Sequence, residues 1–170
     1  MEAFFYMCYY VKKEAVMSKG SAAAIKKIKL WVGLKEGPEV DLVILKTYND
    51  YFGCNRKSKT WPWCAATIAS LFMQLGKLVS GYSRSGACKT QRNYYKKYKR
   101  WIPAGQRPYG GDVIFLSGHE GLVTSTSYTG TSYYVSGNSL NKVRTTKFNW
   151  KTGKTASGKK ILGYGRPKYK

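Results

Sequence analysis

The chain has 170 residues, 43% of them hydrophobic and 15% aromatic, which is enough for one globular domain with a substantial core. Thirty Lys and Arg residues against eight Asp and Glu residues give a formal net charge of +22, so we expect an anionic partner: nucleic acid, an acidic membrane or an anionic cell-wall polymer. No apolar run approaches the roughly 20 residues of a membrane-spanning helix, and the cysteines and the single histidine lack the spacing of a zinc site. The sequence therefore predicts one domain without a membrane span, a resident metal or a cofactor.

The first half of the chain has the apolar periodicity of helices. Residues 1–20 are aromatic and then charged, with no clean period, and we treat them as an N-terminal extension. Apolar spacing predicts one helix over residues 22–32 and another from Pro38 to about Tyr51. A third helix should begin just after Pro62, because proline cannot lie in a helix interior and apolar residues then recur on one face. These residues are Ile68, Leu71, Phe72 and Leu75.

Cys64 lies at the start of this third helix. Unpaired backbone N–H groups and the positive end of the helix dipole favour the thiolate there and pull the pKa of the thiol below about 8.5. A cysteine at a helix start is by itself more often a small packing residue, but the partners described below make Cys64 the candidate nucleophile. Cys8, Cys54 and Cys88 have no such companions, and we expect them to be structural or free thiols. No secretory signal is recognised, which favours a protein made in a reducing cytoplasm.

Residues 89–101 alternate aromatic and basic side chains. Tyr94, Tyr98 and Trp101 fit one face of a helix, so the simpler interpretation is an amphipathic helix with a basic outer side. The alternative is a strip that stacks bases and binds phosphates of a nucleic acid. We prefer the first interpretation, since helical spacing explains the aromatic residues without a ligand.

After residue 105 the pattern changes to short segments rich in Val, Ile, Thr and Tyr, separated by turn residues. We expect strands over residues 112–116, 122–127, 132–136, 142–148 and 160–164, and a basic loop over 151–160. Helices followed by antiparallel strands predict an α+β domain, with N-terminal helices packed on an antiparallel sheet of about five to six strands.

His119 is the only histidine, and it lies at the head of a predicted strand. A thiol nucleophile needs a base that titrates near neutrality, which imidazole provides. Asn138 follows the next strand, where its amide can hold the histidine in the tautomer that faces the sulfur. Glu120 should point to the opposite face from His119 because side chains alternate along a strand. Asp112 is interpreted as a turn carboxylate that caps backbone N–H groups.

Five segments in this order resemble the CHAP-type cysteine amidase and peptidase domains of phage endolysins and bacterial wall hydrolases. They are Trp-Cys-Ala-Ala at residues 63–66, Tyr-Gly-Gly-Asp-Val-Ile-Phe at 109–115, Gly-His-Glu-Gly-Leu-Val at 118–123, Ser-Gly-Asn-Ser at 136–139 and Ile-Leu-Gly-Tyr-Gly-Arg-Pro at 161–167. The resemblance covers most of the predicted domain, residues 21–170. It implies a papain-like fold that cuts amide bonds of peptidoglycan, with Cys64 as nucleophile and His119 as base.

The chain departs from that family at two places. Many relatives have a glutamate where this chain has Ser136, so Asn138 is expected to orient the imidazole alone. Some relatives carry an acidic residue after the cysteine, near a calcium site, whereas Ala65 and Ala66 follow here. We therefore expect no dependence on calcium.

Taken together, the sequence favours a monomeric, phage-encoded peptidoglycan hydrolase with a Cys64–His119–Asn138 site, with the choice between amidase and endopeptidase open. Its partners would be peptidoglycan and anionic wall polymers rather than nucleic acid, and it would remain in the host bacterial cytoplasm until release to the cell wall. One alternative is a basic nucleic-acid-binding module in which the cysteine and histidine are incidental. Another is a structural phage or wall protein that uses a catalytically degenerate version of the fold to bind wall polymers.

Overall fold

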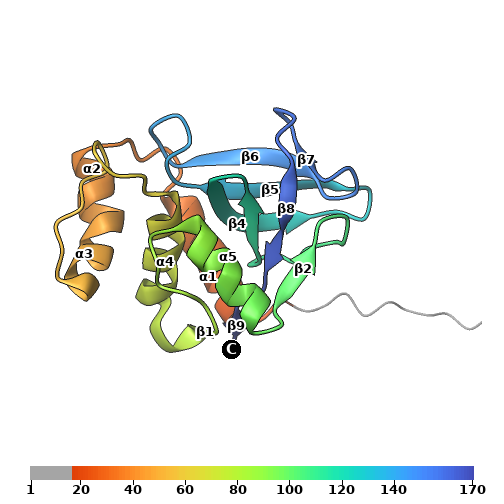
Figure 1. The fold of residues 1–170 in the computed structure, drawn as a ribbon, viewed down its shortest axis with the longest axis horizontal. Coiled ribbons are helices and arrows are strands. Elements are labelled where there is room, and N and C mark those ends of the chain that lie inside the picture. Colours follow the sequence, from red (N-terminus) through yellow and green to blue (C-terminus); the bar gives the residue numbers. More distant parts are fainter. Residues whose placement is uncertain (1–16) are drawn as a thin grey trace, which may run out of the picture.

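The structure is a computed structural model that describes residues 17–170 (Figure 1). The extension predicted over residues 1–20 lies outside the described residues up to residue 16, and the first helix already begins at Lys19. Ser18 caps this helix by accepting a hydrogen bond from the backbone N–H of Ser21 at 3.2 Å, which explains why the helix starts before the apolar pattern does.

The predicted helices are all present. Their bounds are α1 (Lys19–Leu30), α2 (Pro38–Val40), the π-helical η1 (Asp41–Leu45), α3 (Lys46–Phe52), α4 (Cys64–Leu75), the 3-10 turn η2 (Gly76–Leu78) and α5 (Cys88–Lys97). Segments α2, η1 and α3 follow one another without a break and form the single helix predicted from Pro38. Pro38 occupies its first turn, where the missing N–H costs nothing.

The buried face of α5 differs from the prediction. Tyr98 is 52% exposed, and Trp101 lies outside the helix in a short strand, whereas Gln91 and Tyr95 are buried. The reason is a polar anchor, since the Gln91 amide donates hydrogen bonds to the carbonyl of Ala65 at 2.9 Å and to that of Ser85 at 2.7 Å. These bonds turn the face that includes Gln91 and Tyr95 inward, so apolar periodicity alone selected the wrong tyrosine.

The second half of the chain forms an antiparallel sheet of seven strands in the order β2-β8-β3-β4-β5-β6-β7. The strands are β2 (Trp101–Pro103), β3 (Val113–Leu116), β4 (His119–Thr126), β5 (Thr131–Ser136), β6 (Arg144–Asn149), β7 (Lys154–Thr155) and β8 (Ile161–Gly165). The five predicted strands are present, which confirms the α+β class. The expected number of five to six was too low, because β2 and β7 are too short to show alternation and β7 lies in the predicted basic loop.

A second, two-stranded sheet pairs β1 (Val79–Ser80) with β9 (Lys168–Tyr169), so the C-terminal residues lie beside the segment that follows η2 (Figure 1). The backbone N–H of Gly20 donates to the carbonyl of Lys170 at 2.6 Å, and the N–H of Lys170 donates to the carbonyl of Leu78 at 3.1 Å. Lys170 is therefore hydrogen-bonded both to the start of α1 and to the end of η2.

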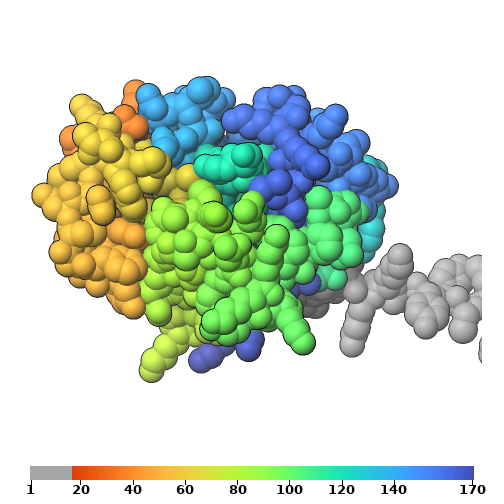
Figure 2. All heavy atoms as spheres, viewed as in Figure 1, coloured from red at the N-terminus to blue at the C-terminus, as the bar shows by residue number. Residues whose placement is uncertain are grey.

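Helices and sheet pack as two layers around α4 (Figure 1). The space-filling view shows the residues of α3 at one side of the molecule and those of β7 at the other (Figure 2). The residues from Cys64 to Phe72 are all buried, where the sequence predicted one buried face, because α4 contacts α1, η1, α3 and β4. One core cluster lies between the helices and the facing side of the sheet, and it includes Val113, Leu122 and Val135. A second cluster lies on the sheet's other side. The position of the Cys64 backbone is thus set by tertiary packing on several sides.

Asp112 precedes β3 and forms a buried ion pair at its edge. Its carboxylate accepts two hydrogen bonds from the Arg166 guanidinium, at 2.9 and 2.7 Å, and a third from the backbone N–H of Tyr109 at 2.8 Å. The predicted capping role is confirmed, and Arg166 adds a bidentate link to the residue that follows β8.

Candidate active site

The start of α4 brings the Cys64 thiol to a point where three segments meet. The residue is 5% exposed. Its sulfur lies 3.5 Å from the sulfur of Cys88, which opens α5, and 4.0 Å from the carbonyl oxygen of Gly118, which lies in the turn between β3 and β4. The candidate nucleophile therefore has a second thiol beside it, which sequence analysis did not anticipate.

His119 opens β4 directly after that turn, and its side chain is partly buried. Its Nε2 lies 3.0 Å from the hydroxyl oxygen of Ser136, the last residue of β5. With Nε2 engaged by Ser136, Nδ1 is the ring nitrogen free to exchange a proton with Cys64. The imidazole lies close enough to the Cys64 sulfur to lower the pKa of that thiol. The structure thus brings Cys64 and His119 together, as the sequence predicted.

The side chain that contacts Nε2 of the imidazole is Ser136 and not Asn138. In the described part of the chain the Asn138 side chain forms no hydrogen bond with His119, and Asn138 lies in a turn with a φ of 52°. Ser136 is still part of β5, where it shares a side of the sheet with Gly121 and faces the head of β4. The assignment of the orienting role to Asn138 therefore finds no support in this geometry.

Gly137 sets how closely the end of β5 approaches the nucleophile helix. A Cβ atom at this position would collide with the hydroxyl of Thr67 and the ring of Trp63, both on the first turn of α4 or just before it. A glycine is required here for close packing, since no side chain fits between the two segments. This contact holds Ser136, and through it His119, against the helix that carries Cys64.

The surroundings of Cys64 favour its thiolate. The pKa of Cys64 is lowered from 9.0 to about 4, first by the hydrogen bond from the Cys88 thiol and then by His119, while burial opposes the shift. The backbone N–H of Ala65 adds a smaller effect in the same direction, as expected at a helix start. The partner thiol is affected in the opposite sense: the pKa of Cys88 is raised, first by its hydrogen bond with Cys64 and then by burial.

Glu120 lies beneath the two thiols. It is fully buried, and neither carboxyl oxygen has a partner with good hydrogen-bond geometry in the described residues. Burial raises the pKa of Glu120 well above its usual value, and the charge of Cys64 raises it further, whereas the Cys88 thiol acts in the opposite direction. No hydrogen bond joins Glu120 to His119 in the described residues, and the pKa of Glu120 is affected by both thiols, so its side chain lies near them.

Sequence analysis gave Cys88, Glu120 and Ser136 no role in the site. None of them is near Cys64 in the sequence, and each reaches the site only through tertiary packing. The available signal was weak: Cys88 immediately precedes a predicted helix, as Cys64 does. Cys54 behaves as expected, because its thiol donates to the side-chain oxygen of Asn49 at 3.3 Å and takes no part in this site. Cys8 lies outside the described residues.

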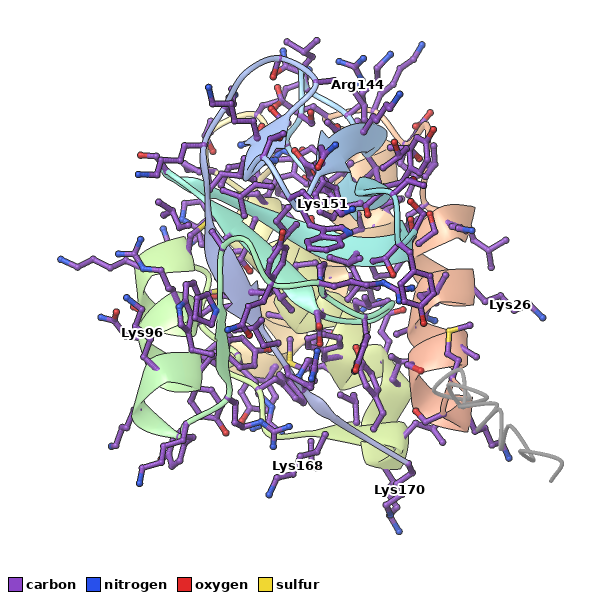
Figure 3. The ribbon with its side chains drawn as sticks, turned by 90° about the vertical axis from the view of Figure 1, so that its right-hand side faces the viewer. Lys26, Lys96, Arg144, Lys151, Lys168 and Lys170 are labelled. Carbon is purple, nitrogen blue, oxygen red and sulfur yellow. The ribbon has the colours of Figure 1, made fainter. Side chains whose placement is uncertain are left out.

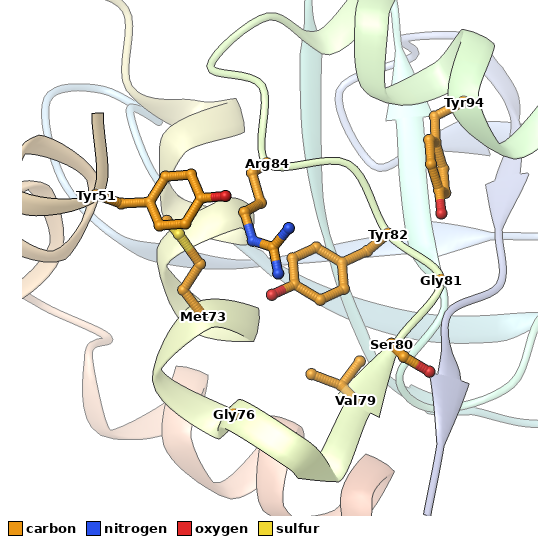
Figure 4. Close-up of a pocket in the computed structure, with 9 residues that line it drawn as sticks. All are labelled: Tyr51, Met73, Gly76, Val79, Ser80, Gly81, Tyr82, Arg84 and Tyr94. Carbon is orange, nitrogen blue, oxygen red and sulfur yellow. The ribbon is translucent and has the colours of Figure 1, made fainter.

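A separate pocket of about 400 Å³ lies near the other end of α4, around Met73 and Gly76 (Figure 4). The guanidinium of Arg84 lies over the ring of Tyr51 at 5.1 Å and over that of Tyr82 at 5.3 Å. Because a helix of 12 residues spans about 18 Å, this pocket is distinct from the thiol site. It offers a cation held between aromatic rings, which suits an anionic group on a larger ligand.

Basic side chains greatly outnumber acidic ones in the described residues. The only acidic residues after residue 50 are Asp112 and Glu120, and both are buried. Residues 51–170 therefore expose no acidic side chain, while their lysines and arginines project into solvent on several sides, as Lys96, Arg144 and Lys168 do in Figure 3. Such a surface attracts a polyanion from many directions.

Three further comparisons concern metals, membranes and known proteins. Among the described residues no group of three or more potential metal ligands comes together, and no helix has the length and hydrophobicity to cross a membrane. Comparison of the chain with models of known protein families, with curated proteins and with solved structures found no match. The function is therefore inferred from the site itself.

Proposed function

We propose that the protein is a cysteine hydrolase with a papain-like arrangement that cuts an amide bond of peptidoglycan peptides. The observation that carries this proposal is the Cys64 thiolate at a helix start, next to an imidazole whose far nitrogen is held by Ser136. A nucleophile, a base and a group that orients the base are the elements of thiol-dependent acyl transfer. The resemblance of the five sequence segments to wall hydrolases supports peptidoglycan as the source of the amide.

The chemistry follows from the positions of these groups. The Cys64 thiolate attacks the carbonyl carbon, and the backbone N–H of Cys64 donates to the oxygen that becomes negative. His119 gives its proton to the leaving amine as the carbon–nitrogen bond breaks, which leaves an acyl group on the sulfur. His119 then takes a proton from water, whose oxygen attacks the thioester, and the acid product and the Cys64 thiolate are released.

The basic surface supports an anionic polymer as the attachment partner. Peptidoglycan of Gram-positive bacteria carries phosphate-rich polymers, and a surface without acidic side chains over residues 51–170 would hold the enzyme on them. Arg84 is the best-placed single contact, because its guanidinium is held by two tyrosine rings at the mouth of a pocket. Attachment and cleavage would thus be carried by different parts of the molecule.

The test is incubation of the full chain with purified Gram-positive peptidoglycan, followed by mass spectrometry of the released fragments. We expect new amine and acid ends from the protein as it is, and none from Cys64→Ala with an unchanged circular dichroism spectrum. Cys54→Ala is the matched control and should cut normally. Undiminished cutting by Cys64→Ala, or the absence of new ends with the unaltered protein, would overturn the proposal.

Attachment is tested separately through salt. Binding to intact walls should weaken steeply as salt rises, because exposed charges are screened beyond about 8 Å at physiological ionic strength, while turnover of a short soluble wall peptide should change little. Arg84→Ala should weaken wall binding more than Lys77→Ala, a matched exposed cation at the end of α4. Salt-sensitive binding to DNA that exceeds binding to walls would instead favour a nucleic-acid-binding module.

A further inference from the structure

Two thiols in the candidate site are close enough to react with one another. The sulfur atoms of Cys64 and Cys88 are 3.5 Å apart, and each residue is the first of its helix, α4 or α5. A disulfide holds its sulfur atoms about 2.05 Å apart, so the pair must close by roughly 1.5 Å to form one. Cys88 favours the Cys64 thiolate through its hydrogen bond, but hydrolysis by Cys64 forms no bond to a second thiol, so Cys88 takes no covalent part in that mechanism.

The two thiols differ in their pKa, and this difference decides which sulfur atom a peroxide oxidises first. The two sulfur atoms are 3.5 Å apart, and the pKa of Cys64 is lowered whereas that of Cys88 is raised, so Cys64 is the thiol that loses its proton first. Thiolates react with peroxides and thiols do not, so the first oxygen transfer should fall on Cys64. Cys88 is then already in contact with the oxidised sulfur.

A second observation that bears on the two thiols is the buried carboxyl of Glu120 next to them. Its carboxyl is fully buried below the thiols and has no hydrogen-bond partner of good geometry in the described part of the chain. Three acidic groups thus share one buried site, and repulsion allows only one of them to be charged easily. When Cys64 loses its negative charge, its hydrogen bond with a protonated Cys88 and its repulsion of a Cys88 thiolate, two of the causes that raise the pKa of Cys88, are removed.

We propose that Cys64 and Cys88 form a reversible disulfide when the protein meets a peroxide. In the first step the Cys64 thiolate attacks one oxygen of hydrogen peroxide, the oxygen–oxygen bond breaks, and sulfenic acid and hydroxide form. In the second step the Cys88 sulfur attacks the Cys64 sulfur, the sulfur–oxygen bond breaks, and the hydroxyl group leaves as water with the Cys88 proton. Two electrons pass from the two sulfur atoms to the peroxide.

The consequence for function rests on the proposed hydrolase, but the disulfide does not. A Cys64 sulfur bound to Cys88 cannot attack a carbonyl, so oxidation would stop hydrolysis and a thiol reductant would restore it. The disulfide would also protect the nucleophile, because a sulfenic acid without a neighbouring thiol is oxidised further to sulfinic acid, which a thiol reductant does not reverse. The protein would therefore survive an oxidising exterior in an inactive, recoverable form.

The experiment uses the full chain with Cys8→Ser and Cys54→Ala, which leaves two thiols. After a small molar excess of hydrogen peroxide, we expect both thiols to be lost to Ellman's reagent, the mass to fall by two hydrogen atoms, and a non-reduced digest to show the peptides of Cys64 and Cys88 joined. The same chain with Cys88→Ser should instead gain oxygen at Cys64, irreversibly. Dithiothreitol should restore both thiols in the first protein only.

Oxygen addition at Cys64 without a link to Cys88 in the two-thiol protein would overturn the proposal. In the unaltered protein, a link from Cys64 mainly to Cys8 or Cys54 would overturn it as well. The mass measurement on unaltered protein decides the matter even if a variant fails to fold. None of these readouts needs hydrolysis, so a failed peptidoglycan test and a failed disulfide test are distinguishable.

Discussion

Two buried carboxyl groups on neighbouring parts of the sheet differ in their hydrogen-bond donors. Asp112, at the start of β3, has three donors within 2.9 Å, two from Arg166 and one from the Tyr109 backbone. Glu120, on β4, has no partner of good geometry in the described residues and lies against two thiols. The first arrangement is what a stable fold requires, whereas the second costs stability and is tolerated where it acts on a reactive group. The contrast separates a structural cluster from a functional one.

The largest expected effect on stability is at the structural cluster. Asp112→Asn keeps the shape of the side chain but leaves Arg166 without its ion pair. We expect a loss of about 2–3 kcal/mol in the free energy of unfolding, less than for a fully buried pair because Arg166 is partly exposed to solvent. Urea denaturation measures it. Hydrolysis per folded molecule should be unchanged. A loss of activity without a loss of stability would show that Asp112 serves the candidate active site and not the stability of the fold.

Glu120→Gln should raise the free energy of unfolding, whereas Asp112→Asn lowers it. The pKa of Glu120 is raised in the folded state, so its neutral form is favoured there, and the fold loses stability as pH rises from about 4.5 toward the folded-state pKa. The variant lacks this loss. Its stability relative to the unaltered protein should therefore rise by about 1.4 kcal/mol for each pH unit in that window. Urea denaturation at pH 4.5, 6 and 7.5 measures this difference, and a pH-independent difference would show that Glu120 is charged and paired.

The same contrast explains how much the sequence could predict. Helices and the longer strands follow from local periodicity, and Cys64 and His119 are recognisable because a helix-start thiol and a lone histidine have few competing roles. Ser136 was passed over for Asn138, since choosing between them depends on where β5 ends and how Gly137 packs on Trp63. Cys88 and Glu120 acquire their roles only from contacts between distant segments, and no local pattern encodes such contacts.

Ser136→Ala tests the contact between Ser136 and His119, and its expected effect is on turnover. Loss of the hydroxyl frees the His119 ring to rotate, and misplacement of a base typically costs roughly 10- to 100-fold in turnover. The readout is kcat on a soluble wall peptide together with the thermal midpoint, which should hardly move. Ser136→Thr retains a hydroxyl and should recover much of the rate. Equal activity of the alanine variant and the unaltered protein would mean that Ser136 does not position the base.

The smallest effect is expected from Asn138→Ala, the change that the sequence alone would have ranked above Ser136→Ala. Asn138 has a φ of 52°, in the left-handed region that asparagine tolerates better than alanine, so the variant should lose a little stability, roughly 1 kcal/mol. Asn138→Gly relieves that backbone strain while still removing the amide, and so separates conformation from chemistry. Because Ser136 already holds Nε2, neither variant should lower kcat by more than about twofold. A loss in the glycine variant as large as in Ser136→Ala would show that the amide reaches the imidazole during turnover, and the orienting role would return to Asn138.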